Sequence, residues 1–210
     1  MVITRLERQK KRRHRVSVYL DGDFAFGCNE EVIFRFGLHK GMELDDAKRR
    51  EVEDYDNRVQ AKLAAERLVG ARMRSEQELR RRLKDKEYPE DIIDETIATF
   101  TRVGLIDDRA FAEAFVRDRL RLRPRAASLL RRELRQRGIA KDIIDDVLAA
   151  QFEEHDENEL ARGMAEAYLR SHPRLERLVL KRRLAGFLQR KGFPAGMVYQ
   201  IVNDLLQHDD

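Results

Sequence analysis

Apolar and polar side chains alternate near the start of the chain, as they do in a β-strand with one buried face. One side of this expected strand carries His14, Val16, Val18 and Leu20. Asp21-Gly22 then supplies residues that suit a tight hairpin turn, and residues 24–28 provide the returning strand. An earlier strand over residues 3–7 fits the same alternation more weakly.

Residues that start and stop helices follow the hairpin. Asn29 can cap a short helix that continues through Phe36, and Gly37 can end that helix. After Gly41, a long charged helix is expected to begin near Asp45. The rest of the chain has the apolar spacing of helices.

An internal repeat defines the expected fold of the helical part. When Leu79-Arg-Arg-Arg-Leu83 is placed on Leu130-Arg-Arg-Glu-Leu134, the apolar positions that follow also match. A second shift carries Leu134 onto Leu188, and the apolar positions match again. The matched sets are Tyr88, Ile92, Ile93 and Ile97; Ile139, Ile143, Ile144 and Leu148; and Phe193, Met197, Val198 and Val202.

Helix-ending and helix-starting residues repeat in step with the apolar ones. Gly138 and Gly192 occupy equivalent helix ends, and Pro89 and Pro194 occupy equivalent first-turn positions. Ser75-Glu-Gln-Glu78 has the spacing of a capping box at the start of a helix. Each repeat is therefore expected to contain three helices.

These patterns predict a mainly α protein, an elongated array of three tandem three-helix repeats behind a small N-terminal β-hairpin. The expected parts are 1–44 for the hairpin and short helix, then repeats at 45–106, 107–155 and 156–210. Three short helices bury little apolar surface alone, so neighbouring repeats should stabilise one another.

Charge is abundant and unevenly distributed. The chain has 43 basic and 39 acidic residues and a net charge of only +4, so the total indicates little about partners. The first twenty residues, however, are strongly basic, whereas residues 142–159 carry acidic residues and neither Lys nor Arg. Such segregation is typical of an electrostatic binding surface.

Basic residues concentrate at two kinds of position. The hairpin region carries Lys10, Lys11, Arg12, Arg13 and Arg15, and the second helices of the repeats carry Arg80, Arg81, Lys84, Lys86, Arg131, Arg132, Arg135, Arg137, Arg182, Arg183, Arg190 and Lys191. We expect the second-helix side chains to point outward and the hairpin cluster to enter a groove, and both to bind phosphate or carboxylate groups, which the guanidinium fork fits. The alternatives are a disordered basic tip in the hairpin region and an ordinary solvated face on the helices. The acidic first turns of the third helices favour the helix dipole.

Catalytic, metal and cofactor sites are not expected. The five histidines are scattered, and the sequence has neither a Gly-rich phosphate loop nor a nucleophile elbow. The acidic stretch 153–157 lacks the spacing and the glycine of an EF-hand. The single cysteine, Cys28, is expected to be a small buried side chain. With no apolar leader or membrane-length segment, we expect a cytoplasmic, monomeric protein that does not contact membranes.

The sequence resembles the RecX family of recombination regulators over essentially its whole length. The resemblance rests on the hairpin segment from Val16 to Phe26, the Gly104-Leu-Ile-Asp-Asp-Arg-Ala-Phe111 junction and the stretch from Glu133 to Ile139. Two departures stand out: Arg123 precedes Pro124 where the family often has Gly, and the last helix of the third repeat is poor in acidic residues.

The resemblance implies a non-enzymatic regulator that lodges in the helical groove of RecA filaments on single-stranded DNA. Such a regulator usually inhibits the recombinase, ATPase and co-protease activities of RecA. Whether double-stranded DNA is also bound stays open. Two other functions fit the residues: a helix-turn-helix-like DNA-binding regulator, and a protein scaffold whose charged faces bind partner helices.

Overall fold

The computed structural model describes residues 1–10, 14–153 and 156–207. Its contacts define two compact units. The first contains Met1–Met73 and Leu79–Ile106, and the second contains Arg74–Glu78 and the chain from Asp107 onward. None of the described helices is both long enough and apolar enough to cross a membrane.

The first unit begins with a three-stranded antiparallel sheet. Strands β1 (Ile3–Arg8), β2 (Arg15–Leu20) and β3 (Asp23–Asn29) lie in the order β1-β2-β3. The predicted hairpin is confirmed, with Asp21 and Gly22 at φ values of 50° and 102° in its turn. The weaker strand prediction is confirmed as well, so the hairpin is part of a larger sheet.

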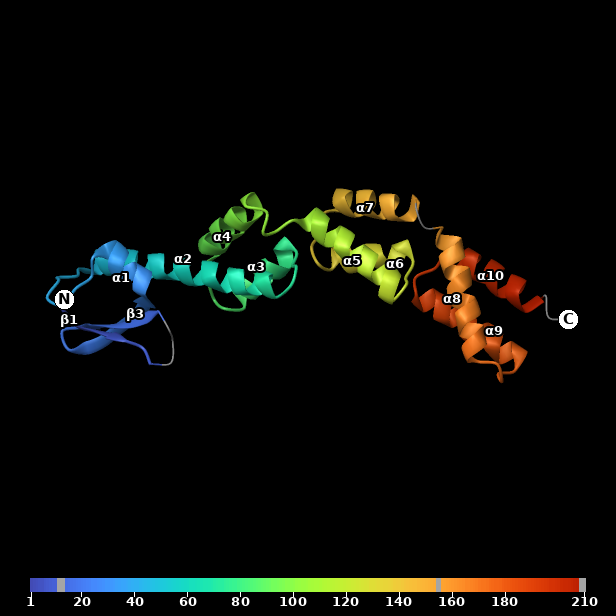
Figure 1. Cartoon of the computed structure of the whole chain (residues 1–210), viewed down its shortest axis with the longest axis horizontal. Helices are drawn as coiled ribbons and strands as arrows, with labels where there is room; N and C mark the ends of the chain where they lie inside the picture. The colour runs from blue at the N-terminus through green and yellow to red at the C-terminus, as the bar shows by residue number, and fades with distance from the viewer. Residues whose placement is uncertain (11–13, 154–155, 208–210) are drawn as a thin grey trace. The chain divides into compact units, whose positions relative to one another are not determined.

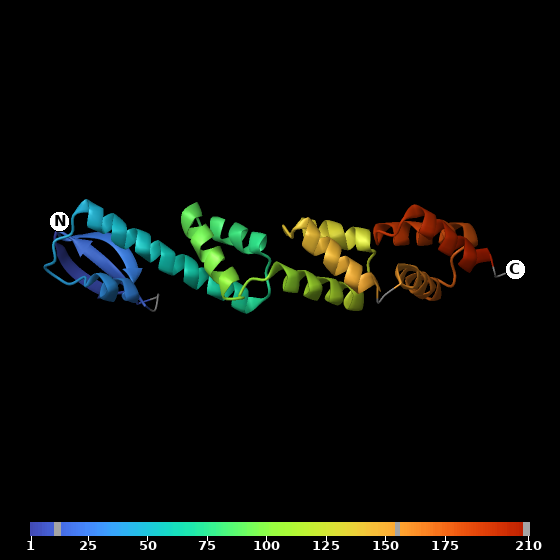
Figure 2. The same cartoon turned by 90° about the horizontal axis from the view of Figure 1, so that it is seen from above.

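The sheet packs against two helices (Figure 1, Figure 2). Helix α1 (Glu30–Phe36) starts at Asn29, whose side chain accepts a hydrogen bond from the Glu31 amide, and ends at Gly37. Helix α2 (Asp46–Ala71) starts at Asp45, as the sequence predicts. Its N-terminal half contributes Val52 and Val59 to the core under the sheet.

The remaining helices form three three-helix domains, which confirms the predicted fold class. The first combines the C-terminal half of α2 with α3 (Glu76–Lys84) and α4 (Glu90–Arg102). The second contains α5 (Asp108–Leu122), α6 (Ala127–Arg135) and α7 (Lys141–Glu153). The third contains α8 (Glu157–Ser171), α9 (Arg177–Arg190) and α10 (Ala195–Gln207).

Equivalent leucines fill the three cores. The second helix of each domain buries a pair of leucines with no exposed surface: Leu79 and Leu83, Leu130 and Leu134, and Leu184 and Leu188. Isoleucine and valine from the third helix of each domain pack against them. The repeated apolar spacing therefore corresponds to a repeated core.

Pro89 and Pro194 precede their helices, whereas the sequence suggested that they lie in the first turn. Pro89 is the residue before α4, and Pro194 is the residue before α10. Their carbonyl oxygens accept the first helical hydrogen bonds, from the amides of Ile93 and Val198, both at 3.0 Å. The fixed φ of proline still suits this position because no proline N–H is needed there.

Hydrogen bonds to backbone carbonyls join successive domains within the second unit. The Ala126 amide donates to the carbonyl of Lys191 at 3.0 Å, and the Ser128 hydroxyl donates to the carbonyl of Gly192 at 2.5 Å. Ser75, just before α3, makes the equivalent contact with the loop after α6: its hydroxyl donates to the carbonyl of Arg137 at 2.6 Å. The start of one second helix thus binds the end of the next.

Candidate interaction surfaces

The basic cluster beside the hairpin divides between the surface and the interior. Lys10 follows β1 and is exposed. Lys11, Arg12 and Arg13 lie outside the described residues. The fifth member, Arg15, points inward, and its side chain is only 18% exposed.

Arg15 connects the sheet to α2. Its Nη2 lies 3.2 Å from Oδ2 of Asp56, and it also donates to the carbonyl of Gly27. The other carboxylate oxygen of Asp56 accepts from the Asn29 amide at 2.7 Å. The expectation that Arg15 contributes to a binding surface therefore needs correction: the guanidinium is occupied by partners within the first unit.

Burial is the largest influence on Asp56 and raises the pKa of its carboxyl group. The Asn29 amide and the Arg15 guanidinium act in the opposite direction. Both favour the ionised carboxylate, which is the form that satisfies the two donors around it.

One row of second-helix arginines binds carboxylates of the third helix. Arg80 Nη1 lies 2.5 Å from Oδ1 of Asp94 and 3.1 Å from Oε1 of Glu90. At the equivalent positions of the second domain, Arg131 lies 3.2 Å from Oδ1 of Asp145. Because these two arginines already have acidic partners, they are less available to an outside ligand than the sequence suggests.

A second set of ion pairs recurs from the first helix to the third. Arg58 pairs with Glu95, and Arg109 lies 2.6 Å from Oδ2 of Asp146 at the equivalent positions. The acidic doublets 94–95 and 145–146 therefore each bind two arginines from two different helices. Sequence reasoning assigned these acids to the helix dipole and missed the pairs, although the repetition of the doublet was a visible signal.

Another row of basic residues on the second helices points to solvent. In the described part of the chain, the exposed basic side chains of this row with no ion pair are Arg81, Lys86, Arg132, Arg135, Arg182, Arg183 and Arg190. Lys84 is also exposed, with Nζ 3.5 Å from Glu90. We call this set the outward row. Its third instance is altered, because Gly186 and Gln189 stand where the second domain has Arg132 and Arg135.

The last two candidates contact aromatic rings. The guanidinium of Arg137 lies 4.4 Å from the ring centre of Phe115, and its Nη1 donates to the carbonyl of Glu133 at 2.8 Å. Lys191 Nζ lies 5.6 Å from the ring centre of Phe187. Arg137, which is only 27% exposed, therefore has a mainly structural environment.

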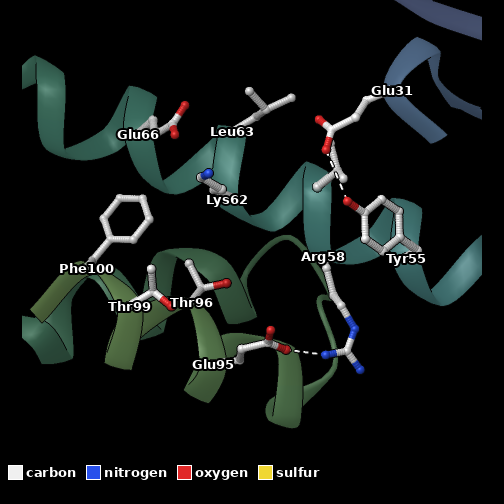
Figure 3. A pocket seen from close by; sticks show the side chains of 11 residues that line it. Glu31, Tyr55, Arg58, Lys62, Leu63, Glu66, Glu95, Thr96, Thr99 and Phe100 are labelled. Atoms are coloured by element: carbon white, nitrogen blue, oxygen red, sulfur yellow. Dashed lines mark hydrogen bonds and ion pairs between the residues drawn. The ribbon is translucent and has the colours of Figure 1, made fainter. Parts of the chain in front are cut away.

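A pocket between α2 and α4, of about 260 Å³, is a weaker candidate for a ligand site (Figure 3). Its lining includes both acidic and basic residues, and three of them, Glu31, Arg58 and Glu95, pair with neighbours. Tyr55 donates to Glu31 at 3.1 Å, and Arg58 pairs with Glu95. Across the described residues, no cluster of His, Cys, Asp and Glu has the arrangement of a metal site.

Comparison with known proteins covers most of the chain. A family model described as the regulatory protein RecX N-terminal domain matches residues 1–45. Models of the first, second and third three-helix domains of RecX match residues 61–100, 107–148 and 155–202.

Similar full-length proteins have the same description. A regulatory protein RecX of Bacillus velezensis is 32% identical, and the match covers 99% of this chain and 77% of the relative. That of Clostridium acetobutylicum is 28% identical over 99% of this chain and 98% of the relative.

Solved structures give the same result. A crystal structure of regulatory protein RecX matches 97% of this chain and 98% of its own with a TM-score of 0.68 and 30% identity. RecX from Lactobacillus salivarius, at 22% identity and a TM-score of 0.62, shares the fold over 72% of this chain and 97% of its own. The chain therefore belongs to the RecX family of regulatory proteins.

Proposed function

We propose that this protein binds RecA filaments on single-stranded DNA, in their helical groove, and inhibits the recombinase, ATPase and co-protease activities. It acts without catalysis of its own, as a monomer in the cytoplasm. Family membership supports a regulatory role, and the outward row supports the kind of partner. Double-stranded DNA is a second candidate ligand.

The outward row is the observation that carries this proposal. Arg81 and Arg132 are exposed, whereas their neighbours Arg80 and Arg131 are paired with acids. Guanidinium groups fit phosphate and carboxylate groups, which a DNA–protein filament presents at regular intervals. Several weak contacts along such a polymer add up to stable binding.

Charge reversal in the outward row tests the proposal. The variant Arg81→Glu/Arg132→Glu/Arg135→Glu should raise the concentration needed to inhibit the DNA-dependent ATPase of RecA by about tenfold or more, with unchanged helicity. A matched control reverses three exposed arginines on other helices: Arg50, Arg102 and Arg117. Inhibition by the first variant at the wild-type concentration would refute the assignment.

The basic cluster beside the hairpin requires a separate test. Changing Lys10, Lys11, Arg12 and Arg13 to Glu should weaken inhibition, and the salt dependence of binding should fall by about 0.7 for each phosphate that is no longer neutralised. An unchanged salt dependence would exclude the cluster from the DNA-binding surface. Arg15 is left unchanged in this variant because it binds Asp56.

Two other functions predict different results. A sequence-specific regulator would strongly prefer one duplex in a competition assay, but the second helices offer few amide or hydroxyl side chains for base recognition. A protein scaffold would bind RecA monomers without DNA. Either result would replace the filament-groove proposal.

A further inference from the structure

In the described part of the third three-helix domain, the ion pair between the second and third helices that the other two domains share is replaced, whereas a pair between its first and third helices is present, with Arg162 3.0 Å from Asp204. Where the first two domains have Arg80 and Arg131, the third has Ala185, and where they have Asp94 and Asp145, it has Tyr199. The acidic doublet of the third helix is thereby replaced by Tyr199-Gln200. A small residue and an aromatic ring thus stand where two charged side chains meet in the other domains.

A groove of about 810 Å³ lies between α9 and α10, and both replaced positions, Ala185 and Tyr199, belong to its lining. Its apolar lining comprises Leu178, Val179, Ala185, Ala195, Val198, Tyr199 and Val202. Leu178 is 75% exposed and Tyr199 is 67% exposed, although both are large hydrophobic side chains. Because these two side chains line one groove together with other apolar residues, they belong to a contiguous apolar surface, and such surfaces typically mark binding sites.

The spacing of the lining residues matches one helix face on each side. On α10, Ala195, Val198, Tyr199 and Val202 follow the i, i+3, i+4, i+7 pattern. On α9, the lining extends from Leu178 to Gln189, a length of about 16 Å at the rise of an α-helix. A groove of this kind accommodates about three turns of an amphipathic helix.

The charged residues of the groove have one sign. Lys181 and Arg182, both exposed, belong to its lining, and no acidic residue does. The complementary ligand therefore has an apolar stripe flanked by carboxylates. Single-stranded DNA is less suitable, because base stacking requires aromatic faces and Tyr199 is the one aromatic residue lining the groove in the described chain.

We propose that the α9–α10 groove docks an acidic amphipathic helix of a partner protein. Docking buries the exposed leucine and tyrosine, and the partner's carboxylates pair with Lys181 and Arg182. The groove shares Arg182 with the outward row, but the proposal does not depend on RecA or DNA binding, and it gives the third domain a role of its own.

The test uses the full-length chain and a fluorescent synthetic peptide of about 14 residues, with leucines in an i, i+3, i+4, i+7 stripe and glutamates elsewhere. Fluorescence anisotropy should show saturable binding. A matched peptide with lysine in place of every glutamate should bind at least about tenfold more weakly. Equal affinity for the two peptides would overturn the charge assignment and with it the proposal.

Two variants locate the binding site. Ala185→Arg/Tyr199→Asp gives the third domain the pair that the second domain already has, and it should weaken binding at least about tenfold by filling the groove. Leu178→Glu, at an exposed position, should also weaken binding without disturbing the core. Circular dichroism checks that both variants keep wild-type helicity.

Unchanged peptide affinity in either folded variant would refute the groove as the site. A short oligothymidylate provides the remaining comparison. If it competes with the glutamate peptide and loses affinity on Ala185→Arg/Tyr199→Asp, the groove is a DNA site and the proposal is wrong. Because RecA is absent from the assay, this outcome is separate from failure of the proposed function.

Discussion

Arg131 and Asp145 form an ion pair of 3.2 Å between α6 and α7, and both side chains remain partly exposed. This pair holds an arginine that could otherwise bind an anionic partner. In the variant Asp145→Ala, Arg131 loses its carboxylate and should bind phosphate instead. We expect affinity for single-stranded DNA to rise several-fold and the salt dependence to steepen by about 0.7.

The control for that variant is Asp142→Ala. It removes the same charge from the same helix without releasing Arg131. Equal effects of the two variants on DNA binding would show that only the total charge matters. The stability cost of Asp145→Ala should stay below about 1 kcal/mol because the pair is exposed to solvent.

The buried pair of Arg15 and Asp56 should behave differently. Asp56→Ala leaves a largely buried guanidinium and the Asn29 amide without their acceptor. We expect the free energy of unfolding, measured with urea, to fall by about 3 kcal/mol. Glu53→Ala, which breaks the neighbouring solvent-accessible pair with Arg49, should cost less than about 1 kcal/mol. A similar loss in both variants would contradict this assignment.

Cys28 should make stability depend on alkaline pH. Burial raises the pKa of its thiol from 9.0 to about 12, with Asp56 adding to the effect. Between these values the unfolded chain loses the thiol proton and the folded chain keeps it, so rising pH favours unfolding. The thiol should contribute a loss of up to about 1.4 kcal/mol per pH unit above pH 9.

Replacing the thiol provides the comparison. The wild-type chain and Cys28→Ala are unfolded in urea across this pH range, and only the wild type should show the thiol's contribution. Parallel stability curves for the two proteins would disprove the assignment. In the folded wild type, the same burial should make the thiol slow to react with disulfide reagents at pH 8.

Gly192→Ala should destabilise the second unit by about 2 kcal/mol or more. Gly192 has a φ of 92°, and an added Cβ would lie 2.7 Å from the Cβ of Leu129. Both the left-handed backbone and the crowding oppose the extra methyl group. Thermal unfolding measures the loss.

Gly163→Ala is the matched control for that substitution. Gly163 lies inside α8, with no atom within 4 Å of an added Cβ, so alanine should raise stability by about 0.5–1 kcal/mol. Opposite signs for the two glycines would support the structural reasoning, and a loss of the same size at both would contradict it.

The sequence predicted the helices and their order because local signals determine them. Asn29, Gly37 and Asp45 act through their nearest neighbours, and each limits a helix as expected. The paired leucines of the second helices were also identifiable, since apolar spacing marks the buried face of a helix. The repeated apolar spacing in the sequence therefore correctly predicted the repeated cores.

Long-range partners were harder to predict. Arg15 is bound by Asp56, 41 positions later, and strand alternation alone does not show that the first side chain of β2 reaches a carboxylate on α2. A signal was present, however. Asp56 stands between Val52 and Val59 at the spacing of the buried stripe of α2, where an acidic residue requires a basic partner.

The availability of each arginine also depended on tertiary structure. Arg80 and Arg81 are neighbours of the same type, yet the first meets Asp94 and the second faces solvent. The helix period separates their directions, but only the position of α4 determines which one is bound. The candidate site was therefore predicted at the level of helices, and less reliably at the level of single side chains.

The hydrogen bonds from Ala126 to Lys191 and from Ser128 to Gly192 fix the spacing between α6 and α9 in the second unit. Both acceptors are backbone carbonyls and one of the two donors is a backbone amide, so the position of α9 relative to α6 depends on main-chain geometry more than on side-chain identity. Surface arginines can consequently be exchanged without changing the interval at which the two helices are presented. Point substitutions on the surface would therefore leave unchanged the spacing at which the two helices meet a polymeric target.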